Sequence, residues 1–200
     1  RQKLINSKAN IQDRLNPILH TFQGDVNDLS NKIKIKLNEA WYWGDKNTEN
    51  YLNGTMYGNK VLNYLLWRYE DHIQKNLGYQ IDVSIDEEQI EHISPQTPTN
   101  GDPISTGYDV DSTNKYSELF ITEQLNCLGN LMLIAGIHNR VIGNKPFIDK
   151  LSSYSNSLLL QQKEIDGFAG IESGNKVWKV DSIVNRQKKI VDFAIQTWSF

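Results

Sequence analysis

The chain has 200 residues, 38% of them hydrophobic and 22% charged, which is the composition of a folded globular protein and excludes a disordered chain. Its single cysteine, Cys127, excludes an intrachain disulfide and a cysteine-based structural zinc site, and the lack of any run of about 18 apolar residues excludes a membrane-spanning helix. The formal net charge of -3 argues mildly against nucleic-acid binding, because duplex-binding domains are usually basic, although local charge matters more than the total.

The N-terminal part of the chain is predicted to be helical. Residues 1–22 read as a helix that breaks before Pro17, and residues 28–43 read as a second helix. The polar segment 44–54 is expected to form turns. The clearest helix covers residues 57–77, where apolar residues recur at helical spacing. We therefore expect helices up to about residue 77.

The pattern changes after this helix. Residues 79–85 alternate between apolar and polar, which predicts a strand, and residues 91–93 are expected to form a short strand end. The segment 97–115 is rich in Pro and Gly and is expected to be a loop, followed by a short apolar strand at 131–134. Further helices are predicted at 115–125, 145–153, 158–163 and 181–198.

The predicted fold class is mainly α, within α+β: a helical domain that encloses a small unit of strand, loop, strand and helix. The chain begins with Arg1 rather than Met, and no signal peptide is visible. We therefore expect a cytoplasmic fragment, in which residues 1–56 are a helical segment at the end of a linker to a missing N-terminal domain. Residues 57–200 would form the functional domain, with its core at about 79–153.

Three stretches in this small unit carry the chemistry that the sequence predicts. They are Glu91–Gln96, which contains His92 and Pro95, then Gly129–Leu133, and then His138-Asn139-Arg140. Oxygen ligands from a carboxylate and an amide suit a hard divalent cation, so Glu91 and Asn139 are candidate metal ligands. His92 is the candidate general base, because a neutral imidazole can take a proton from water. Together these groups suit the hydrolysis of a phosphodiester.

The spacing of these residues raises a geometric difficulty. Adjacent residues on a strand point to opposite faces, so Glu91 and His92 share one site only if the strand ends there. Pro95 favours such an ending because it cannot donate a ladder hydrogen bond. Asn130 is expected to brace the loop that orients the imidazole, by hydrogen bonds from its side chain to the backbone.

These residues resemble a known family of nucleases. The run Glu91-His92-Ile93-x-Pro95, the segment Asn130-Leu131-x-Leu133, and Asn139 follow the pattern of HNH, or His-Me finger, nucleases. A longer set is similar to the C-terminal nuclease domain of GmrSD-type modification-dependent restriction enzymes. That set consists of Ile90–Gln96, Leu128–Leu131, Asn139, Phe147–Lys150, Tyr154 and Ser157, and the resemblance covers about residues 57–198.

The resemblance implies a ββα-metal (HNH) endonuclease that nicks or cuts DNA in bacterial defence against phage. It assigns catalysis to His92 and Asn130 and metal binding to Glu91 and Asn139, with His138 as an alternative ligand. Many family members carry Asp where this chain carries Glu91. Mg²⁺ is the expected cation, with Mn²⁺ or Ni²⁺ as substitutes. A fused sensor or nucleotide-hydrolysing domain, absent from this chain, is the expected partner.

Basic residues gather in two segments of the chain. Arg140, Lys145 and Lys150 follow the motif closely and are predicted to bind the DNA backbone, although such a run can also be a solvated face. A second basic cluster, formed by Arg186, Lys188 and Lys189, lies in the last predicted helix.

Two other functions stay open at this point. A domain of the same fold could have lost turnover and act as a DNA-binding or regulatory module, which predicts salt-sensitive binding without cleavage. A helical protein-interaction domain with an accidental motif would show no DNA binding and no stabilisation by a metal.

Overall fold

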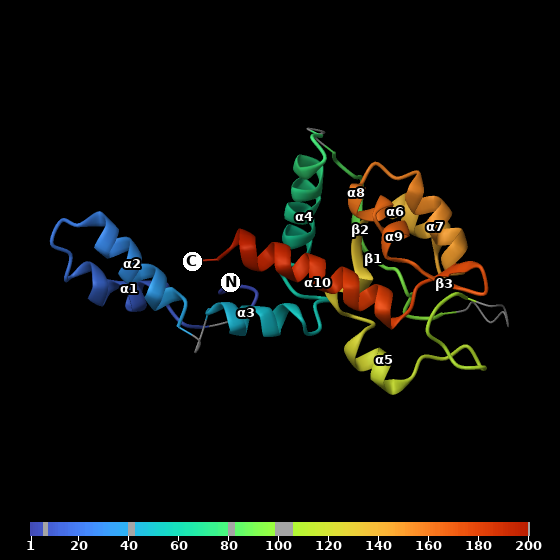
Figure 1. The fold of residues 1–200 in the computed structure, drawn as a ribbon, viewed down its shortest axis with the longest axis horizontal. Helices are drawn as coiled ribbons and strands as arrows, with labels where there is room; N and C mark the ends of the chain where they lie inside the picture. The colour runs from blue at the N-terminus through green and yellow to red at the C-terminus, as the bar shows by residue number, and fades with distance from the viewer. Residues whose placement is uncertain (6–7, 40–42, 80–82, 99–105, 200) are drawn as a thin grey trace.

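The computed structural model describes residues 1–200 apart from 6–7, 40–42, 80–82, 99–105 and 200, and it is mainly helical with two small antiparallel sheets (Figure 1). The described helices, in chain order, are α1 (Ile11–Leu19), α2 (Val26–Leu37), α3 (Asp45–Leu52), α4 (Leu62–Asn76), α5 (Glu118–Glu123), α6 (Gly136–Ile142), α7 (Phe147–Ser155), α8 (Leu160–Lys163), α9 (Ile165–Phe168) and α10 (Val180–Thr197). The strands are β1 (Glu88–His92), β2 (Leu131–Ala135), β3 (Gly170–Glu172) and β4 (Asn175–Val177), and a 3-10 turn, η1 (Leu128–Asn130), leads into β2. The mainly α, α+β class predicted from the sequence is confirmed.

Helices α1 and α2 pack against each other and stand apart from the other helices (Figure 1). Each begins at a side chain that accepts hydrogen bonds from the backbone of the first turn, Asn10 for α1 and Asp25 for α2. The prediction of one helix from residue 1 that breaks before Pro17 was wrong. Helix α1 starts at the Asn10 cap and continues through Pro17, which lacks the N–H that would bond to the Asp13 carbonyl oxygen, and the helix ends two residues later at Leu19.

The middle of the chain differs from the prediction at two points. The polar segment 44–54 contains helix α3, whose buried residues Thr48 and Leu52 lie four positions apart on one face. The strand predicted at 79–85 lies partly outside the described residues, and the described residues 83–85 are not in a strand. Val83 and Ile85 alternate because they pack against a hydrophobic core, not because they pair with a neighbouring strand.

The antiparallel pair of β1 and β2 (the β1–β2 hairpin, whose strands are joined by a long segment that contains α5) lies between two hydrophobic cores and separates them. The strands pair antiparallel from Glu88 opposite Ala135 to His92 opposite Leu131. Leu131 and Leu133 face the first core, which also includes residues of α3, α4 and α10, whereas Met132 and Ile134 face the second core, which includes residues of α7. Figure 1 shows the hairpin between α4 on one side and α6 and α7 on the other. Because directly paired residues point to the same face, the β2 partner of each β1 residue shows which core that residue faces.

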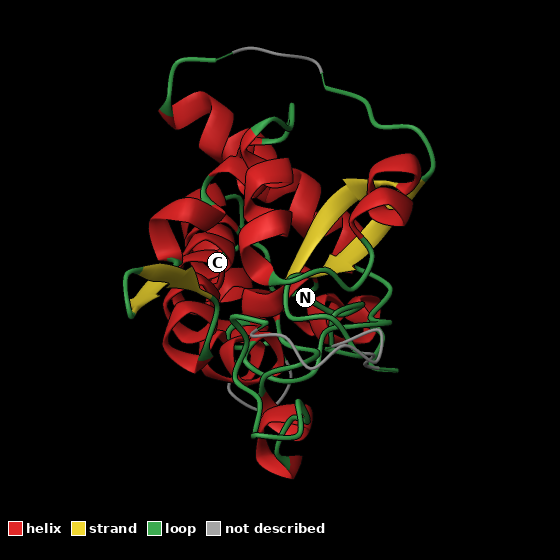
Figure 2. Cartoon of the chain, turned by 90° about the vertical axis from the view of Figure 1, so that its right-hand side faces the viewer, coloured by secondary structure: helices red, strands yellow, loops and turns green. Residues whose placement is uncertain are grey.

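The first core also joins the N-terminal segment to the rest of the protein. Leu4, Leu52 and Met56 belong to it together with α4 and α10. The boundary expected between residues 1–56 and 57–200 therefore runs through this core. The small β3–β4 hairpin, which the sequence did not predict, lies on the other side of the helices from β1–β2 (Figure 2). Among the described residues, no helix is both long enough and apolar enough to cross a membrane.

Candidate functional site

The unit formed by β1, β2 and α6 holds most of the residues that the sequence singled out. His92 ends β1, Asn130 immediately precedes β2, and His138 and Asn139 lie on α6, which follows β2 without a linker. Helix α6 contacts both strands of the hairpin. The order strand, loop, strand, helix matches the order predicted from the motifs, with the long loop between His92 and Asn130.

Glu91 and His92 lie on opposite faces of this hairpin. Glu91 pairs with Met132, which faces the second core, and His92 pairs with Leu131, which faces the first core. Cross-strand partners share a face, so the two side chains point away from each other. The ending of the strand at His92 does not bring them to one side of the sheet.

The Glu91 carboxylate is buried, and its Oε1 contacts two residues of α7. Lys150 Nζ lies 2.6 Å from Glu91 Oε1, and the Tyr154 hydroxyl donates to the same oxygen over 2.9 Å. Burial raises the pKa of Glu91, and the Lys150 ammonium opposes this shift. The carboxylate that was expected to hold a cation thus holds an ammonium and a phenol.

Lys150 is not on the surface where phosphate contact was expected. Its side chain is 0% exposed, and its ammonium also donates to the carbonyl oxygens of His92, over 3.1 Å, and Ile93, over 3.4 Å. Burial lowers the pKa of Lys150, whereas Glu91 raises it. An ammonium has three donors, and here all three point at oxygens of the β1 end, so none is left for DNA.

The imidazole of His92 lies on the other face, against Asn126 and Tyr57. Its Nε2 lies 3.0 Å from Asn126 Oδ1, and the ring centroid lies 4.5 Å from that of Tyr57. The residue is buried, and this burial lowers the pKa of His92. The imidazole is therefore neutral near pH 7, which is the state that a general base needs.

Asn130 ties the chain after His92 to the start of β2. Its Oδ1 accepts from the Ser94 backbone N–H at 2.8 Å and from Trp178 Nε1 at 3.2 Å. Its Nδ2 donates to the carbonyl oxygens of Ser94, at 3.1 Å, and Leu125, at 2.9 Å. All four bonds are made by a fully buried amide, so Asn130 fixes the path of the chain directly after the imidazole.

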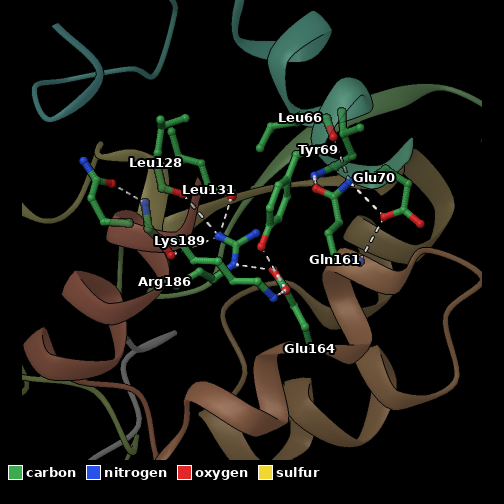
Figure 3. A network of polar contacts seen from close by, with 12 residues as sticks. Leu66, Tyr69, Glu70, Leu128, Leu131, Gln161, Glu164, Arg186 and Lys189 are labelled. Carbon is green, nitrogen blue, oxygen red and sulfur yellow. Dashed lines mark hydrogen bonds and ion pairs between the residues drawn. The ribbon is translucent and has the colours of Figure 1, made fainter. Parts of the chain in front are cut away.

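A buried arginine from α10 holds the turn η1 that carries Asn130 (Figure 3). Arg186 Nη1 donates to the carbonyl oxygens of Leu128, Gly129 and Leu131 at 3.2, 3.0 and 2.8 Å. Arg186 Nε donates to Glu164 Oε1, and the other oxygen of Glu164 accepts from Tyr69 and Lys189. Arg186, one of the three residues of the C-terminal basic cluster, is therefore a buried structural residue, because its side chain is 0% exposed.

The glycine before Asn130 is required by the same contact. A Cβ atom on Gly129 would lie 2.1 Å from the Ile183 carbonyl oxygen of α10. No side chain fits at that distance, so only glycine lets α10 approach η1 closely enough for Arg186 to reach its carbonyl groups.

The residues of α6 are close to the hairpin but make separate contacts. Asn139 Nδ2 donates to Gln89 Oε1 over 2.8 Å. Because Gln89 lies two positions before Glu91 in β1, Asn139 is on the same face of the hairpin as Glu91. His138 Nε2 lies 2.5 Å from Ser153 Oγ of α7, and burial lowers the pKa of His138. The structure therefore places all three candidate metal ligands on the side away from His92.

The two other basic residues of the motif region are exposed. Arg140 forms an ion pair with Glu87 over 2.8 Å, and both side chains are 60% exposed. Lys145 is exposed as well. These two cations are accessible to a DNA backbone, unlike Lys150.

A divalent cation at Glu91 Oε1 would compete with Lys150 in this arrangement. The Lys150 ammonium already occupies Glu91 Oε1 and would repel a second positive charge at close range. Within the described ranges, no group of three or more His, Cys, Asp or Glu side chains could hold a metal ion. Cation binding by Glu91 Oε1 therefore requires the Lys150 ammonium to leave.

Three contributions to the site were not predicted from the sequence: those of Asn126 and Tyr57 and the pairing of Lys150 with Glu91. Asn126 and Tyr57 lie in turns without a motif, so no local signal marks them. Lys150 and Tyr154 did carry a signal, because residues four apart on a helix share a face and can reach one partner.

The chain is similar to a known protein family. A family model described as the C-terminal domain of GmrSD restriction endonucleases matches residues 41–193, which include β1, β2 and α6. No curated protein matches the chain.

Proposed function

Because the chain belongs to the family of GmrSD restriction endonuclease C-terminal domains, we propose that it is a divalent-cation-dependent DNA endonuclease domain of the HNH type. One observation carries the proposal at the level of residues. The neutral, buried imidazole of His92 ends the first strand of the β1–β2–α6 unit. The chain that follows it is held by the Asn130 amide, which makes four hydrogen bonds, two of them to the backbone of Ser94. This is the arrangement that a positioned general base requires.

In this proposal His92 takes a proton from the attacking water. As the water oxygen bonds to phosphorus, the bond from phosphorus to one ester oxygen breaks, and solvent protonates the leaving oxygen. Asn130 does not touch the substrate and acts by holding Ser94, two residues after the imidazole, in place. A well-placed base of this kind contributes about 10²–10⁴-fold to the rate.

The restriction endonuclease family supports a divalent-cation requirement, and Mg²⁺ is the proposed ion, with Mn²⁺ or Ni²⁺ as substitutes. Glu91 and Asn139 are the proposed ligands, with His138 as the alternative, because all three lie on one side of the hairpin. Glu91 Oε1 can act in this way only after it releases Lys150. A cation held by these ligands can serve the phosphate beside His92 only if the chain at the end of β1 brings both to one side, because the ligands and the imidazole face opposite sides of the two strands.

The test of the proposal is a supercoiled-plasmid assay with residues 1–200. We expect nicking in the presence of Mg²⁺ or Mn²⁺, none with EDTA, and none with a variant that lacks His92. Activity that persists equally in that variant would indicate a contaminating nuclease and would remove the support for His92.

The exposed cations Arg140 and Lys145 are the proposed contacts to the DNA backbone. For the double variant Arg140→Ala/Lys145→Ala, we expect weaker DNA binding and a salt dependence, log Kd against log salt, that is shallower by up to about 2 in slope. Fluorescence anisotropy over a series of salt concentrations measures both quantities.

Lys32→Ala/Lys34→Ala is the matched control for this change. It removes the same charge from α2, which stands apart from the hairpin unit (Figure 1). Equal slopes for both double variants would contradict a specific role for Arg140 and Lys145.

A second candidate function is favoured by the Glu91–Lys150 ion pair. A domain whose metal-binding carboxylate is permanently neutralised by lysine would bind DNA without cutting it. The same plasmid assay, combined with the anisotropy measurement, separates the two functions: binding without nicking at any divalent cation supports the silent module.

We place the domain in a cytoplasmic anti-phage restriction protein. A sensor or nucleotide-hydrolysing domain is proposed elsewhere in that protein, because the matching family is described as a C-terminal domain. In that arrangement the helical segment 1–56 would connect the two.

A further inference from the structure

The two nitrogens of the His92 ring have different surroundings. Nε2 lies 3.0 Å from Asn126 Oδ1. Asn126 is itself anchored, because its carbonyl oxygen accepts hydrogen bonds from the backbone N–H groups of Met56, at 2.8 Å, and Tyr57, at 3.2 Å. The Tyr57 ring packs on the imidazole with its centroid 4.5 Å away and its plane tilted by 59°. One edge of the ring is thus fixed by a residue that belongs to no motif.

The chemistry of the amide decides which nitrogen carries the proton. A neutral imidazole has one N–H donor and one acceptor nitrogen, and an amide oxygen can only accept. With the Asn126 oxygen at Nε2, the proton must be on Nε2, and Nδ1 keeps a free lone pair. A base acts through the unprotonated nitrogen, so the partner of Nε2 determines whether Nδ1 can take a proton.

We propose that Asn126 is a positioning residue that holds His92 in the Nε2–H tautomer and so leaves Nδ1 to accept the proton of the attacking water. The catalytic part rests on the proposed nuclease function. The tautomer itself is a property of the folded protein and holds whether or not the protein cuts DNA.

The anchoring of Asn126 couples the base to the first core. The N–H groups that hold its carbonyl oxygen belong to the turn before α4, where Met56 is fully buried in that core. The turn of Asn126 also leads directly into η1, which Arg186 holds. Asn126 is therefore fixed from both sides, as a residue that orients a base must be.

The experiment is a long-range ¹H–¹⁵N NMR correlation on residues 1–200 with ¹⁵N-labelled histidine, which distinguishes the two tautomers of each neutral ring. The chain has four histidines, and His92→Gln assigns the signals of His92. We expect the Nε2–H form in the wild-type protein. In Asn126→Ala we expect a mixture of tautomers and a loss of nicking of about 10- to 100-fold, since the base as a whole contributes about 10²–10⁴.

Asn126→Asp distinguishes positioning from a merely structural role. Aspartate keeps an acceptor oxygen at the same position, so we expect it to restore the Nε2–H tautomer and to retain more activity than Asn126→Ala. Gln124→Ala, a polar truncation in the same turn, is the control and should leave both the tautomer and the nicking rate unchanged.

Two results would overturn the inference. One is the Nδ1–H tautomer in the wild-type protein, which would mean that the Asn126 amide donates to the ring. The other is an unchanged tautomer in Asn126→Ala. If the wild-type protein does not nick DNA but the tautomer shifts as expected, the proposed function fails while Asn126 is still shown to position the ring.

Discussion

Replacing His92 with alanine is expected to lower the rate of plasmid nicking by about 10²–10⁴-fold, because that is the usual contribution of a general base. The reason lies in the local environment. The imidazole is buried, burial lowers its pKa, and Asn126 and Tyr57 fix its orientation. The adjacent Glu91 carboxylate cannot replace it, because it lies on the opposite face of the hairpin. A time course of the conversion of supercoiled to open-circular plasmid measures the effect.

The controls must separate lost chemistry from lost structure. His92→Asn keeps a polar side chain but cannot take a proton, so it should be as inactive as His92→Ala. His20→Ala, at the exposed C-terminal end of α1, should behave as the wild type. DNA affinity of the His92 variants should change little. A nicking rate within about threefold of the wild type for His92→Ala would place the base elsewhere, given the contribution expected of it.

The sequence predicted the hairpin unit because its signals are local. Asn130-Leu131 before an apolar strand and the residues at the end of β1 lie within a few positions of each other, and the structure has them in β1, η1 and β2. The long amphipathic helices α4 and α10 were predicted for the same reason, since their apolar faces repeat over several turns. The error at 79–85 has the opposite cause. An extended segment that packs on a core alternates just as a strand does, and only its lack of a pairing partner distinguishes the two.

The contacts of the candidate site could not be read from the sequence, because they join distant segments. Lys150 reaches Glu91 from α7, and Arg186 reaches η1 from α10. A charged residue in a mainly polar stretch is usually solvated, so a buried role for Lys150 or Arg186 is improbable until the fold is known. Even the opposite orientation of Glu91 and His92, which alternation predicts, needed the pairing with β2 before each face could be assigned to a core.

Replacing Lys150 with methionine is expected to lower the free energy of unfolding by about 3–5 kcal/mol, because removing one partner of a buried ion pair leaves the other charge uncompensated. Methionine fills much of the same space, so the loss of packing is small. Glu91 would keep only the Tyr154 hydroxyl and lose the 2.6 Å contact with the ammonium. Urea denaturation followed by circular dichroism measures the difference.

Lys145→Met is the matched control, since it makes the same change five residues away at an exposed position, and it should change stability by less than about 0.5 kcal/mol. In the double variant Glu91→Gln/Lys150→Met the charge that lacked a partner is gone, so part of the lost stability should return. Equal stability of Lys150→Met and Lys145→Met would show that the ion pair is not formed in solution.

The deficit of Lys150→Met should also depend on pH, and its sign follows from the carboxyl group. Burial raises the pKa of Glu91, and the loss of Lys150 removes the group that opposes this shift. A group whose pKa is raised in the folded state is most stabilising below its unfolded pKa, about 4.3 for Glu, and loses that stabilisation as the pH rises through the folded pKa. The deficit relative to the wild type should therefore be largest near pH 7 and shrink as the pH falls toward 4.3.

The same variant connects stability with the proposed cation. In the wild type a divalent cation must displace an ammonium from Glu91 Oε1, whereas in Lys150→Met the carboxylate is free to accept it. A ligand that binds only the folded state raises the melting temperature. If Glu91 is a metal ligand, Mn²⁺ should therefore raise the melting temperature of Lys150→Met more than that of the wild type, and Glu91→Gln/Lys150→Met should lose the effect. An equal response of all three proteins would assign Glu91 and Lys150 to the fold alone and leave the cation to other ligands.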